Sequence, residues 1–218
     1  LGLAIPNPFT LSNFATVFGN SLAIHALLNS LIQAVGGVVV IGIAATLAAY
    51  ALSRSTLPGK GAVTYVLLLF SSVVSGSAAM VPIFLIISAL GLIDTQVAVI
   101  LVFACGLLPT AMFILREFID GIPKSYEESA MVAGASPIQA FFDVALPVIR
   151  PGIVVVVVWA FVNVWGGFLI PFILLRSSDQ MPASVAIYSF YSEAGTPIVT
   201  LLAAYSLIYS LPVIALYL

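Results

Sequence analysis

Long apolar runs decide what this chain can fold into. A membrane-spanning helix needs about 20 predominantly apolar residues, and runs of at least that length cover approximately residues 25–52, 62–90, 95–115, 152–175 and 197–218. The runs are apolar on all faces, as in helices that pack among lipid and other helices, and they lack the period-two alternation of barrel strands. The sequence therefore predicts an all-α polytopic membrane protein with five transmembrane helices in this chain.

The composition excludes most other classes of protein. Only 6% of the 218 residues are charged and 62% are hydrophobic, whereas about 25% of the residues of an ordinary soluble domain are charged. A soluble enzyme, a nucleic-acid-binding protein and a disordered chain are therefore excluded. Cys105 is the single cysteine and His25 the single histidine, so neither an internal disulfide nor a Cys/His metal cluster can form. We predict no metal or cofactor site in this chain.

The basic residues predict the orientation of the spans in the membrane. Five of the six lie in two loops that the predicted spans place on one side: Arg54, Lys60, Arg116, Lys124 and Arg150. Only Arg176 falls on the opposite side. Because cytoplasmic loops carry an excess of Lys and Arg, the loop after the first run and the loop after the third are expected in the cytoplasm, and residues 1–24 outside.

Two of the runs contain polar residues that support two interpretations. Ser72, Ser75 and Pro82 interrupt the second run, which is either a bent packing helix or a segment that lines a translocation pathway, with a kink or break expected at Pro82. Asn163 lies inside the fourth run beside Trp165. Its amide either makes a packing hydrogen bond or lines the pathway.

The loop of about residues 116–151 holds eight of the fourteen charged residues and is the first candidate for function. Ser125 can cap a helix, with Glu128 completing a capping box, and Gly134 can end that helix in a left-handed conformation. Ser136 then caps a second short helix, which is expected to end before Leu146-Pro147. The loop is therefore predicted to fold as a helix-turn-helix hairpin.

This hairpin offers small residues that let a partner approach closely, an acidic edge, and either Phe141 or Phe142 as an aromatic anchor. The pattern equally allows an amphipathic hairpin on the bilayer surface, although anionic lipids repel its acidic first helix. The residues expected to contact a partner are Glu127, Glu128, Ser129, Ala130, Gly134, Ala135, Ser136, Phe141, Leu146 and Pro147.

The same segment resembles the EAA signature of ABC-importer permeases, whose pattern is Glu-Ala-Ala, three residues, Gly, nine residues, Ile, one residue and Leu-Pro. The match reads Glu128-Ser129-Ala130, Gly134, Val144 and Leu146-Pro147, with unbroken spacing. Ser129 replaces the first Ala, Val144 replaces Ile, and Ala133 stands where sugar-importer members usually carry Asp.

The resemblance to maltose-type permeases extends over essentially the whole chain. Further matching segments are Pro8-Phe9-Thr10-Leu11-Ser12-Asn13-Phe14, Asn29-Ser30-Leu31, Ala48-Ala49-Tyr50-Ala51-Leu52-Ser53-Arg54, Gly91-Leu92-Ile93-Asp94-Thr95 and Trp165-Gly166-Gly167-Phe168. The last departs from the Trp-Asn-Glu or Trp-Asn-Asp that usually precedes this Phe. Family members normally have six spans and a Gly-rich cytoplasmic tail, so the resemblance implies a helix before Leu1 and a tail after Leu218.

The resemblance implies a transporter of several subunits in a bacterial or archaeal plasma membrane. This chain would be a single transmembrane permease domain over residues 1–218, paired with a second permease subunit, two ATP-binding subunits that hold ATP and Mg²⁺, and an external solute-binding protein. Glu128 would lie near the ATPase surface, and Gly134 would allow the turn between the two coupling helices. The chain has no phosphate-binding loop of its own and no nucleophile–base pair, so it is not expected to be an enzyme.

Two other functions compete with this reading. An ion- or proton-coupled secondary transporter would need ionisable residues within the membrane, and none falls near the middle of a predicted span. A structural membrane subunit would leave so specific a hairpin unexplained. The family match suggests a sugar as the solute, but the residues do not choose between an oligosaccharide, a monosaccharide and a glycerol-phosphate ester.

Overall fold

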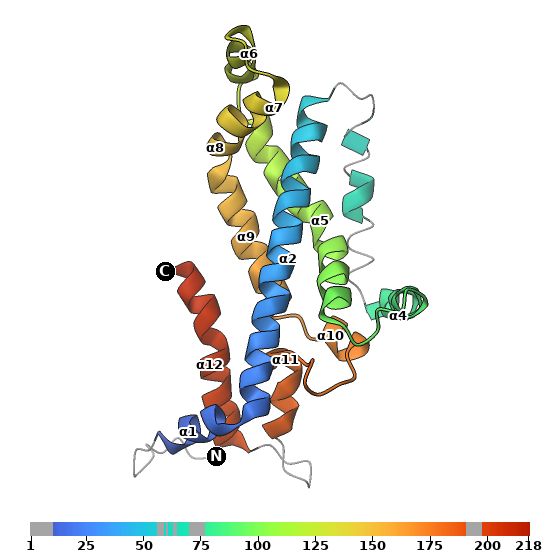
Figure 1. The fold of residues 1–218 in the computed structure, drawn as a ribbon, viewed down its shortest axis with the longest axis vertical. Helices are drawn as coiled ribbons and strands as arrows, with labels where there is room; N and C mark the ends of the chain where they lie inside the picture. Colours follow the sequence, from blue (N-terminus) through green and yellow to red (C-terminus); the bar gives the residue numbers. More distant parts are fainter. Residues whose placement is uncertain (1–10, 56–58, 60, 63–64, 70–76, 191–197) are drawn as a thin grey trace.

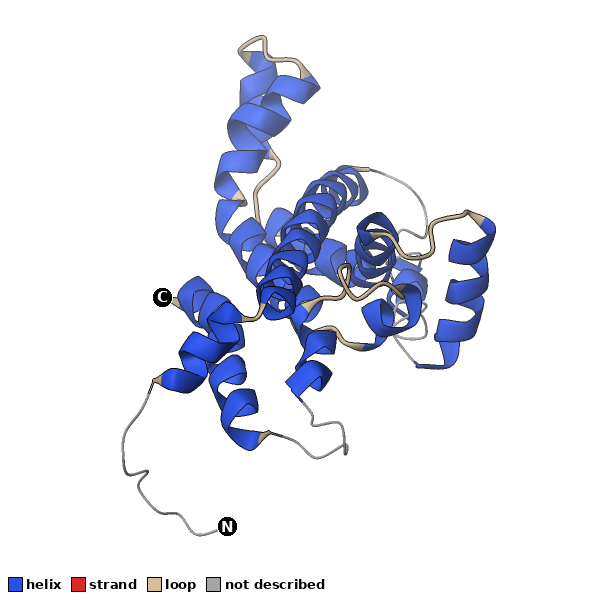
Figure 2. Cartoon of the chain, turned by 60° about the horizontal axis from the view of Figure 1, so that its bottom comes forward, coloured by secondary structure: helices blue, strands red, loops and turns tan. Residues whose placement is uncertain are grey.

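A computed structural model of the chain describes residues 11–55, 59, 61–62, 65–69, 77–190 and 198–218. Within those ranges the chain is helical and contains no strand (Figures 1 and 2). Residues 61–62 and 65–69 are helical, and the helical elements with defined bounds are α1 (Ser12–Gly19), α2 (Ser21–Arg54), η1 (Ser77–Ala79), α4 (Met80–Ala89), α5 (Gln96–Asp120), α6 (Ser125–Val132), α7 (Pro137–Ala140), η2 (Phe141–Ala145), α8 (Leu146–Val148), α9 (Arg150–Trp165), α10 (Leu169–Leu174), α11 (Ala183–Ala186), η3 (Ile187–Phe190) and α12 (Val199–Tyr217).

Helix α2 runs through the length of the structure (Figure 1). It begins where the Asn20 side chain accepts hydrogen bonds from the backbone N–H groups of Leu22 and Ala23, at 3.0 and 3.3 Å. Its 34 residues contain no proline, and at 1.5 Å per residue they span about 50 Å. The helix is therefore long enough to link both ends of the bundle without a break.

Helices α5 and α9 pack against α2 to form the core. The buried face of α2 is made of small residues at helical spacing, including Gly37, Ala45 and Ala49. A Cβ atom at Gly37 would lie 3.1 Å from Val164 of α9, so the two backbones approach closely there. Without a hydrophobic driving force in lipid, such close packing is what holds membrane helices together.

Two smaller groups of helices flank this core. At the start of α2, α1 packs against α12, where Val17 and Tyr205 are fully buried. On the other side, α4 and α10 pack against the beginning of α5, around Val99 and Leu174. The segment α6–α8 projects beyond the opposite end of the bundle, as both ribbon views show (Figures 1 and 2).

Some of the five apolar runs form a single long helix in the structure, and others do not. Three described helices are long and apolar enough to cross a membrane, and they match the first, third and fifth runs: Ser21–Arg54, Gln96–Asp120 and Val199–Tyr217. A fourth candidate is the bent pair Pro137–Val148 and Arg150–Trp165, whose halves meet at 70°. Part of the second run lies outside the described residues; its second half contains α4, which at ten residues is too short to span alone.

The prediction of one helix through the fourth run is wrong. Helix α9 ends at Trp165, and α10 begins only at Leu169. The break is where the sequence places Gly166 and Gly167. A Cβ atom at Gly167 would lie 2.2 Å from the Phe103 ring, so glycine lets α5 and this turn meet without displacing that ring.

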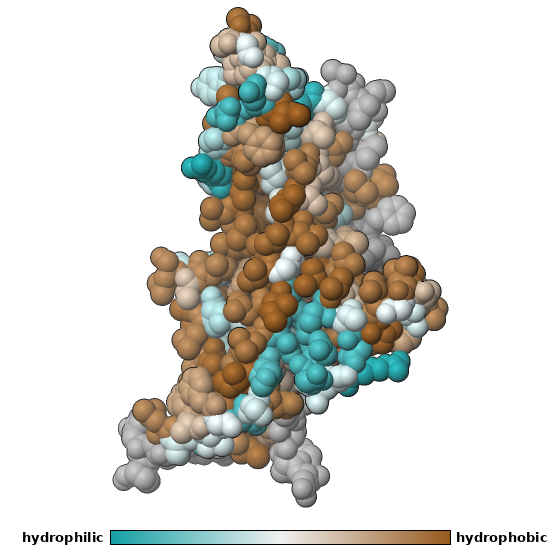
Figure 3. All heavy atoms as spheres, viewed as in Figure 1, coloured by the Kyte–Doolittle hydropathy of each residue, from teal (hydrophilic) through white to brown (hydrophobic). Residues whose placement is uncertain are grey.

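The surface separates apolar and polar residues along the bundle. The outer face of α2 exposes Leu28, Ile32, Val39, Ile43 and Leu47, a stripe suited to lipid rather than water. Hydrophilic residues gather on the projecting segment and around the loops beside α5 and α10 (Figure 3). This distribution fits a bundle whose middle lies in a bilayer.

Candidate functional site

The projecting segment is a helical hairpin with a tightly specified turn. The N–H groups of Gly134 and Ala135 donate to the carbonyls of Met131 and Ala130, each at 3.0 Å, which is the Schellman arrangement that ends a helix. Gly134 has φ +100°, a conformation that a Cβ atom disfavours. The predicted stop at Gly134 is therefore confirmed.

The second half of the hairpin begins with the predicted cap. The Ser136 hydroxyl accepts a hydrogen bond from the Gln139 N–H at 3.3 Å, and the Gln139 side chain accepts one from the Ser136 N–H at 2.8 Å. This reciprocal capping box starts α7 at Pro137. Together with the Schellman turn, it fixes the angle between α6 and α7.

Two predicted helix boundaries in the hairpin are wrong. Ser125 is the first residue of α6 rather than its cap, and the preceding Lys124 already has helical φ and ψ, so no capping box with Glu128 forms. The second helix does not end before Leu146-Pro147; it continues through the π-turn η2 and α8 to Val148. The π-turn widens the hydrogen-bond ladder ahead of Pro147, which has no N–H to donate.

Burial divides the ten predicted contact residues into three groups. Those that are exposed on the hairpin are Glu128, Ser129, Gly134, Ser136 and Pro147, and those that are half-buried are Ala130, Ala135 and Leu146. The other two, Glu127 and Phe141, are buried at 6% and 7% exposure. The tip also exposes large apolar side chains, led by Val132 at 90% and Ile138 at 70%.

Glu127 is directed inward, onto the last turn of α2. One carboxylate oxygen accepts from Arg54 Nε at 2.8 Å and from Arg54 Nη2 at 2.5 Å, and the other accepts from the Tyr50 hydroxyl at 2.8 Å. Arg54 is itself mostly buried, and its Nη2 also reaches the Ile122 carbonyl at 3.4 Å. A buried carboxylate needs this degree of compensation to remain ionised.

The second half of the hairpin rests on the same turn of α2. The Phe141 ring lies 4.6 Å from the Tyr50 ring and 4.9 Å from the Phe142 ring. Next to it, the Ser53 hydroxyl donates to Asp120 at 2.5 Å, and Arg116 pairs with the same Asp120 at 3.2 Å. Both halves of the hairpin and the end of α5 therefore meet on the turn of α2 that ends at Arg54.

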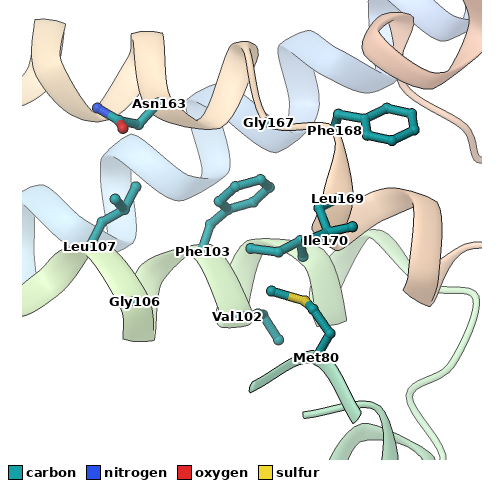
Figure 4. A pocket seen from close by; sticks show the side chains of 10 residues that line it. All are labelled: Met80, Val102, Phe103, Gly106, Leu107, Asn163, Gly167, Phe168, Leu169 and Ile170. Carbon is teal, nitrogen blue, oxygen red and sulfur yellow. The ribbon is translucent and has the colours of Figure 1, made fainter. Parts of the chain in front are cut away.

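A pocket of about 210 Å³ lies at the break between α9 and α10. Its lining residues are Met80, Val102, Phe103, Gly106, Leu107, Asn163, Gly167, Phe168, Leu169 and Ile170. Figure 4 shows Asn163 at one end, Phe168 at the other and Phe103 between them. Asn163 supplies the one polar side chain of this lining, and its Nδ2 donates to the Trp159 carbonyl at 2.8 Å.

The five predicted pathway residues have different environments. Ser72 and Ser75 lie outside the described residues. Pro82 is exposed in the first turn of α4, where its missing N–H disturbs nothing, so the expected kink is replaced by a helix that begins at Met80. Asn163 borders the pocket, and its Nδ2 donates to the Trp159 carbonyl within α9, a bond inside one helix rather than between helices.

Trp165 is buried at 3% exposure and faces α12 instead of the pocket. Its ring stacks between Phe161 and Tyr209, its indole N–H donates to the Tyr209 carbonyl at 3.1 Å, and the Tyr209 hydroxyl donates to the Trp165 carbonyl at 2.6 Å. Sequence reasoning missed the aromatic lining from Phe103 and Phe168; the glycine pair before Phe168 was the available signal.

A polar cluster joins the loops at the end opposite the hairpin. The Asp94 carboxylate accepts hydrogen bonds from the N–H groups of Arg176 and Ser177, at 2.9 and 3.0 Å, and from the Ser177 hydroxyl. The Ser177 hydroxyl, followed by these backbone donors, holds the pKa of Asp94 below its ordinary value. The Asn29 side chain of α2 donates to the carbonyls of Asp179 and Met181, at 2.6 and 3.2 Å. Helix α2 is thus hydrogen-bonded at both ends.

The chain matches a known family of membrane transport proteins. Residues 45–218 fit the model of the binding-protein-dependent transport system inner membrane component. Over 218 residues, the chain is 32% identical to the inner membrane ABC transporter permease protein YcjP of Escherichia coli strain K12, covering 98% of this chain and 76% of that protein. Over 189 residues, it is 33% identical to the trehalose transport system permease protein SugB of Mycobacterium tuberculosis strain CDC 1551, covering 87% and 69% respectively.

The fold also matches a solved structure. A crystal structure of a bacterial ABC transporter involved in the import of the acidic polysaccharide alginate superimposes with a TM-score of 0.86 at 24% identity, covering 100% of this chain and 81% of that one. The chain belongs to the family of binding-protein-dependent inner membrane components, and is a multi-pass permease subunit of an ABC importer in the plasma membrane. The family resemblance inferred from the EAA-like segment is confirmed.

Proposed function

We propose that this chain is one of two permease subunits of an importer for a saccharide, and that its α6–α8 hairpin is the cytoplasmic docking element for an ATP-binding subunit. Two ATP-binding subunits carry ATP and Mg²⁺ and perform the hydrolysis, so this chain is not itself an enzyme. An external binding protein delivers the solute. The five apolar runs then cross the membrane as one domain over residues 1–218, in the orientation that the basic residues predict.

The observation that carries the proposal is the construction of the hairpin. It projects beyond the end of the bundle, its backbone is fixed by a Schellman turn and a capping box, and its tip exposes apolar side chains next to the carboxylate of Glu128. An apolar tip such as Val132 and Ile138 is costly in water, and the acidic first helix is repelled by an anionic leaflet. A protein groove with basic residues at its edge satisfies both features.

The arrangement of charges disfavours the secondary transporter. In the described parts of the spanning helices, charged side chains lie near the ends, as Arg54 does on α2 and Asp120 on α5. Coupling to an ion or proton gradient would need such groups at mid-membrane depth. The described pocket offers only Asn163 as a polar side chain.

A saccharide is the solute class that the relatives support. SugB is named for trehalose, and the superimposed transporter imports alginate. The pocket combines aromatic rings at Phe103 and Phe168 with one amide at Asn163, and sugars are recognised by such combinations of apolar faces and hydrogen-bonding groups. Purification of the external binding protein and mass spectrometry of its bound ligand would identify the sugar, and a ligand that is not a saccharide would contradict this part of the proposal.

The docking role is tested by charge reversal on the exposed face of the hairpin. We expect Glu128→Lys to weaken binding of the ATP-binding subunit in detergent by at least about tenfold, equivalent to about 1.4 kcal/mol, because a like charge then faces the basic edge of the groove. Glu117→Lys is the matched control, because Glu117 is exposed on α5 and its substitution makes the same change of charge outside the hairpin.

Two results would contradict the proposal. One is equal affinity of the Glu128→Lys chain and the wild type for the ATP-binding subunit. The other concerns orientation: a cysteine at position 135, with Cys105 replaced by serine, should react with an impermeant maleimide only from the cytoplasmic side. Reaction solely from outside the cell would exclude a cytoplasmic hairpin.

A further inference from the structure

Glu127 and Glu128 are adjacent in the sequence, but the structure gives them opposite surroundings. Glu128 is exposed on α6, whereas Glu127 is buried and bound by Arg54 and Tyr50 of α2. Consecutive residues on an α-helix differ by about 100° in direction. One side of α6 is therefore available to a partner, and the other side is already occupied by this chain.

The contact with α2 uses both halves of the hairpin. Arg54 binds Glu127 of α6 through two N–H groups, and the Tyr50 ring contacts the Phe141 ring of η2. Because the two-point contact resists rotation as well as separation, the hairpin cannot move far as a unit without moving the end of α2.

Helix α2 is able to carry such a displacement to the opposite end. It is unbroken from Ser21 to Arg54, and near its beginning Asn29 holds the carbonyls of Asp179 and Met181. The Ser30 hydroxyl accepts a further hydrogen bond from the Ala183 N–H at 2.8 Å. A movement at Arg54 thus acts on the loop beyond α10 through one continuous element.

We propose that Arg54, Tyr50 and Glu127 form the mechanical link through which displacement of the hairpin reaches α2, and that Glu127 is a positioning residue instead of an ATPase contact. The inference rests on the proposed function and deepens it. Breaking the link should leave the ATP-binding subunit docked while its movement no longer reaches the far end of α2.

The experiment measures that far end directly, without knowledge of the solute. In the assembled transporter with Cys105→Ser, Asp179→Cys places one reactive thiol on an exposed residue whose carbonyl is held by Asn29. Its labelling rate with an impermeant maleimide is measured without nucleotide and with MgATP plus orthovanadate. We expect the two rates to differ in the otherwise wild-type complex.

We expect Glu127→Gln to retain binding of the ATP-binding subunit but to lose the difference between the two rates. The charge swap Arg54→Glu with Glu127→Arg should restore part of it, which a mere loss of folding would not do. Tyr50→Phe, which keeps the ring on Phe141 and removes one hydrogen bond, should reduce the difference without abolishing it. Glu117→Gln, the removal of an exposed carboxylate on α5, should leave both rates unchanged.

Each contrary outcome has a definite meaning. A Glu127→Gln complex that keeps the nucleotide-dependent difference would overturn the link. Loss of ATPase binding in the same variant would make Glu127 part of the docking surface and would equally overturn it. If the wild-type complex binds its ATPase and position 179 does not respond to nucleotide, α2 does not carry the motion, while the proposed docking function still stands.

Discussion

Gly134 allows a test of the hairpin turn that is free of steric side effects. Its φ of +100° disfavours any residue with a Cβ atom, yet no atom lies within 4 Å of the position that a Cβ would take. Gly134→Ala therefore adds backbone strain and nothing else. The left-handed region costs an L-residue about 1–2 kcal/mol, which corresponds to a factor of about 5–30 in an equilibrium constant.

The strain should be relieved by opening the turn, because α6 and η2 are each anchored to α2 and the turn itself is exposed. Hydrogen exchange of the Gly134 and Ala135 amides, which form the Schellman bonds, is expected to accelerate by that same factor of about 5–30 in Gly134→Ala. Binding of the ATP-binding subunit should weaken only in proportion to the fraction of chains whose turn is open, since docking needs the closed turn. Gly134→Asn is the matched control, because asparagine tolerates this region better than alanine.

Unchanged exchange at Ala135 in the Gly134→Ala chain would refute this reasoning, since the Schellman bonds would then be insensitive to the conformation of residue 134. Faster exchange with unchanged ATPase binding would instead show that the turn stays closed in nearly all of the variant chains. The two measurements together separate the backbone argument from the functional one.

Two further predictions concern the bundle. Gly167→Ala should lower the free energy of unfolding in detergent by about 1–3 kcal/mol, because its Cβ would lie 2.2 Å from the Phe103 ring. Gly42→Ala is the control and should not lower it, because the position of its Cβ is open space. Equal melting temperatures of the two variants would contradict the packing argument. Hydrogen bonding from Ser177 lowers the pKa of Asp94 from its ordinary 3.8. The ionised carboxylate therefore stabilises the fold at pH values above 3.8, and this stabilisation is lost as the pH falls through the lower pKa of the folded state. The difference in melting temperature between wild type and Asp94→Asn should therefore be constant near neutral pH and shrink only in that acidic window, and a difference that shrinks between pH 7 and 5 would contradict the assignment.

The sequence predicted the spans most reliably where one physical quantity decides the outcome. Length and apolar character are enough to identify α2, α5 and α12, because backbone groups in a membrane must be satisfied within the helix. The same criterion failed at α9, since averaging over an apolar run conceals the glycine pair at 166–167, and the need for glycine there comes from Phe103, which is 64 residues earlier in the chain.

The hairpin shows a similar boundary between local and non-local information. Its turn was predictable because Gly134, Ser136 and Pro137 act on neighbouring backbone groups. The end of the second helix was not, because a π-turn has no sequence signature comparable to a cap. The start of α6 at Ser125 was misjudged for a related reason. The Glu128 N–H, which a Ser125 cap would have satisfied, already donates to the Lys124 carbonyl at 3.0 Å.

Assigning both Glu127 and Glu128 to the partner surface treated the acidic edge as one feature. A helix cannot present consecutive side chains to the same surface, so at most one of the two could face the ATPase fully. Which of them turns inward is decided by Arg54, 73 residues away in sequence, and no local pattern contains that information. The pairing also explains why a chain with so few charges buries a glutamate and an arginine at the base of the hairpin. An apolar contact at this place could slide. In contrast, two Arg54 N–H groups on one oxygen of Glu127 and the Tyr50 hydroxyl on the other fix one register between α6 and α2, and a fixed register is what transmission of movement between them requires.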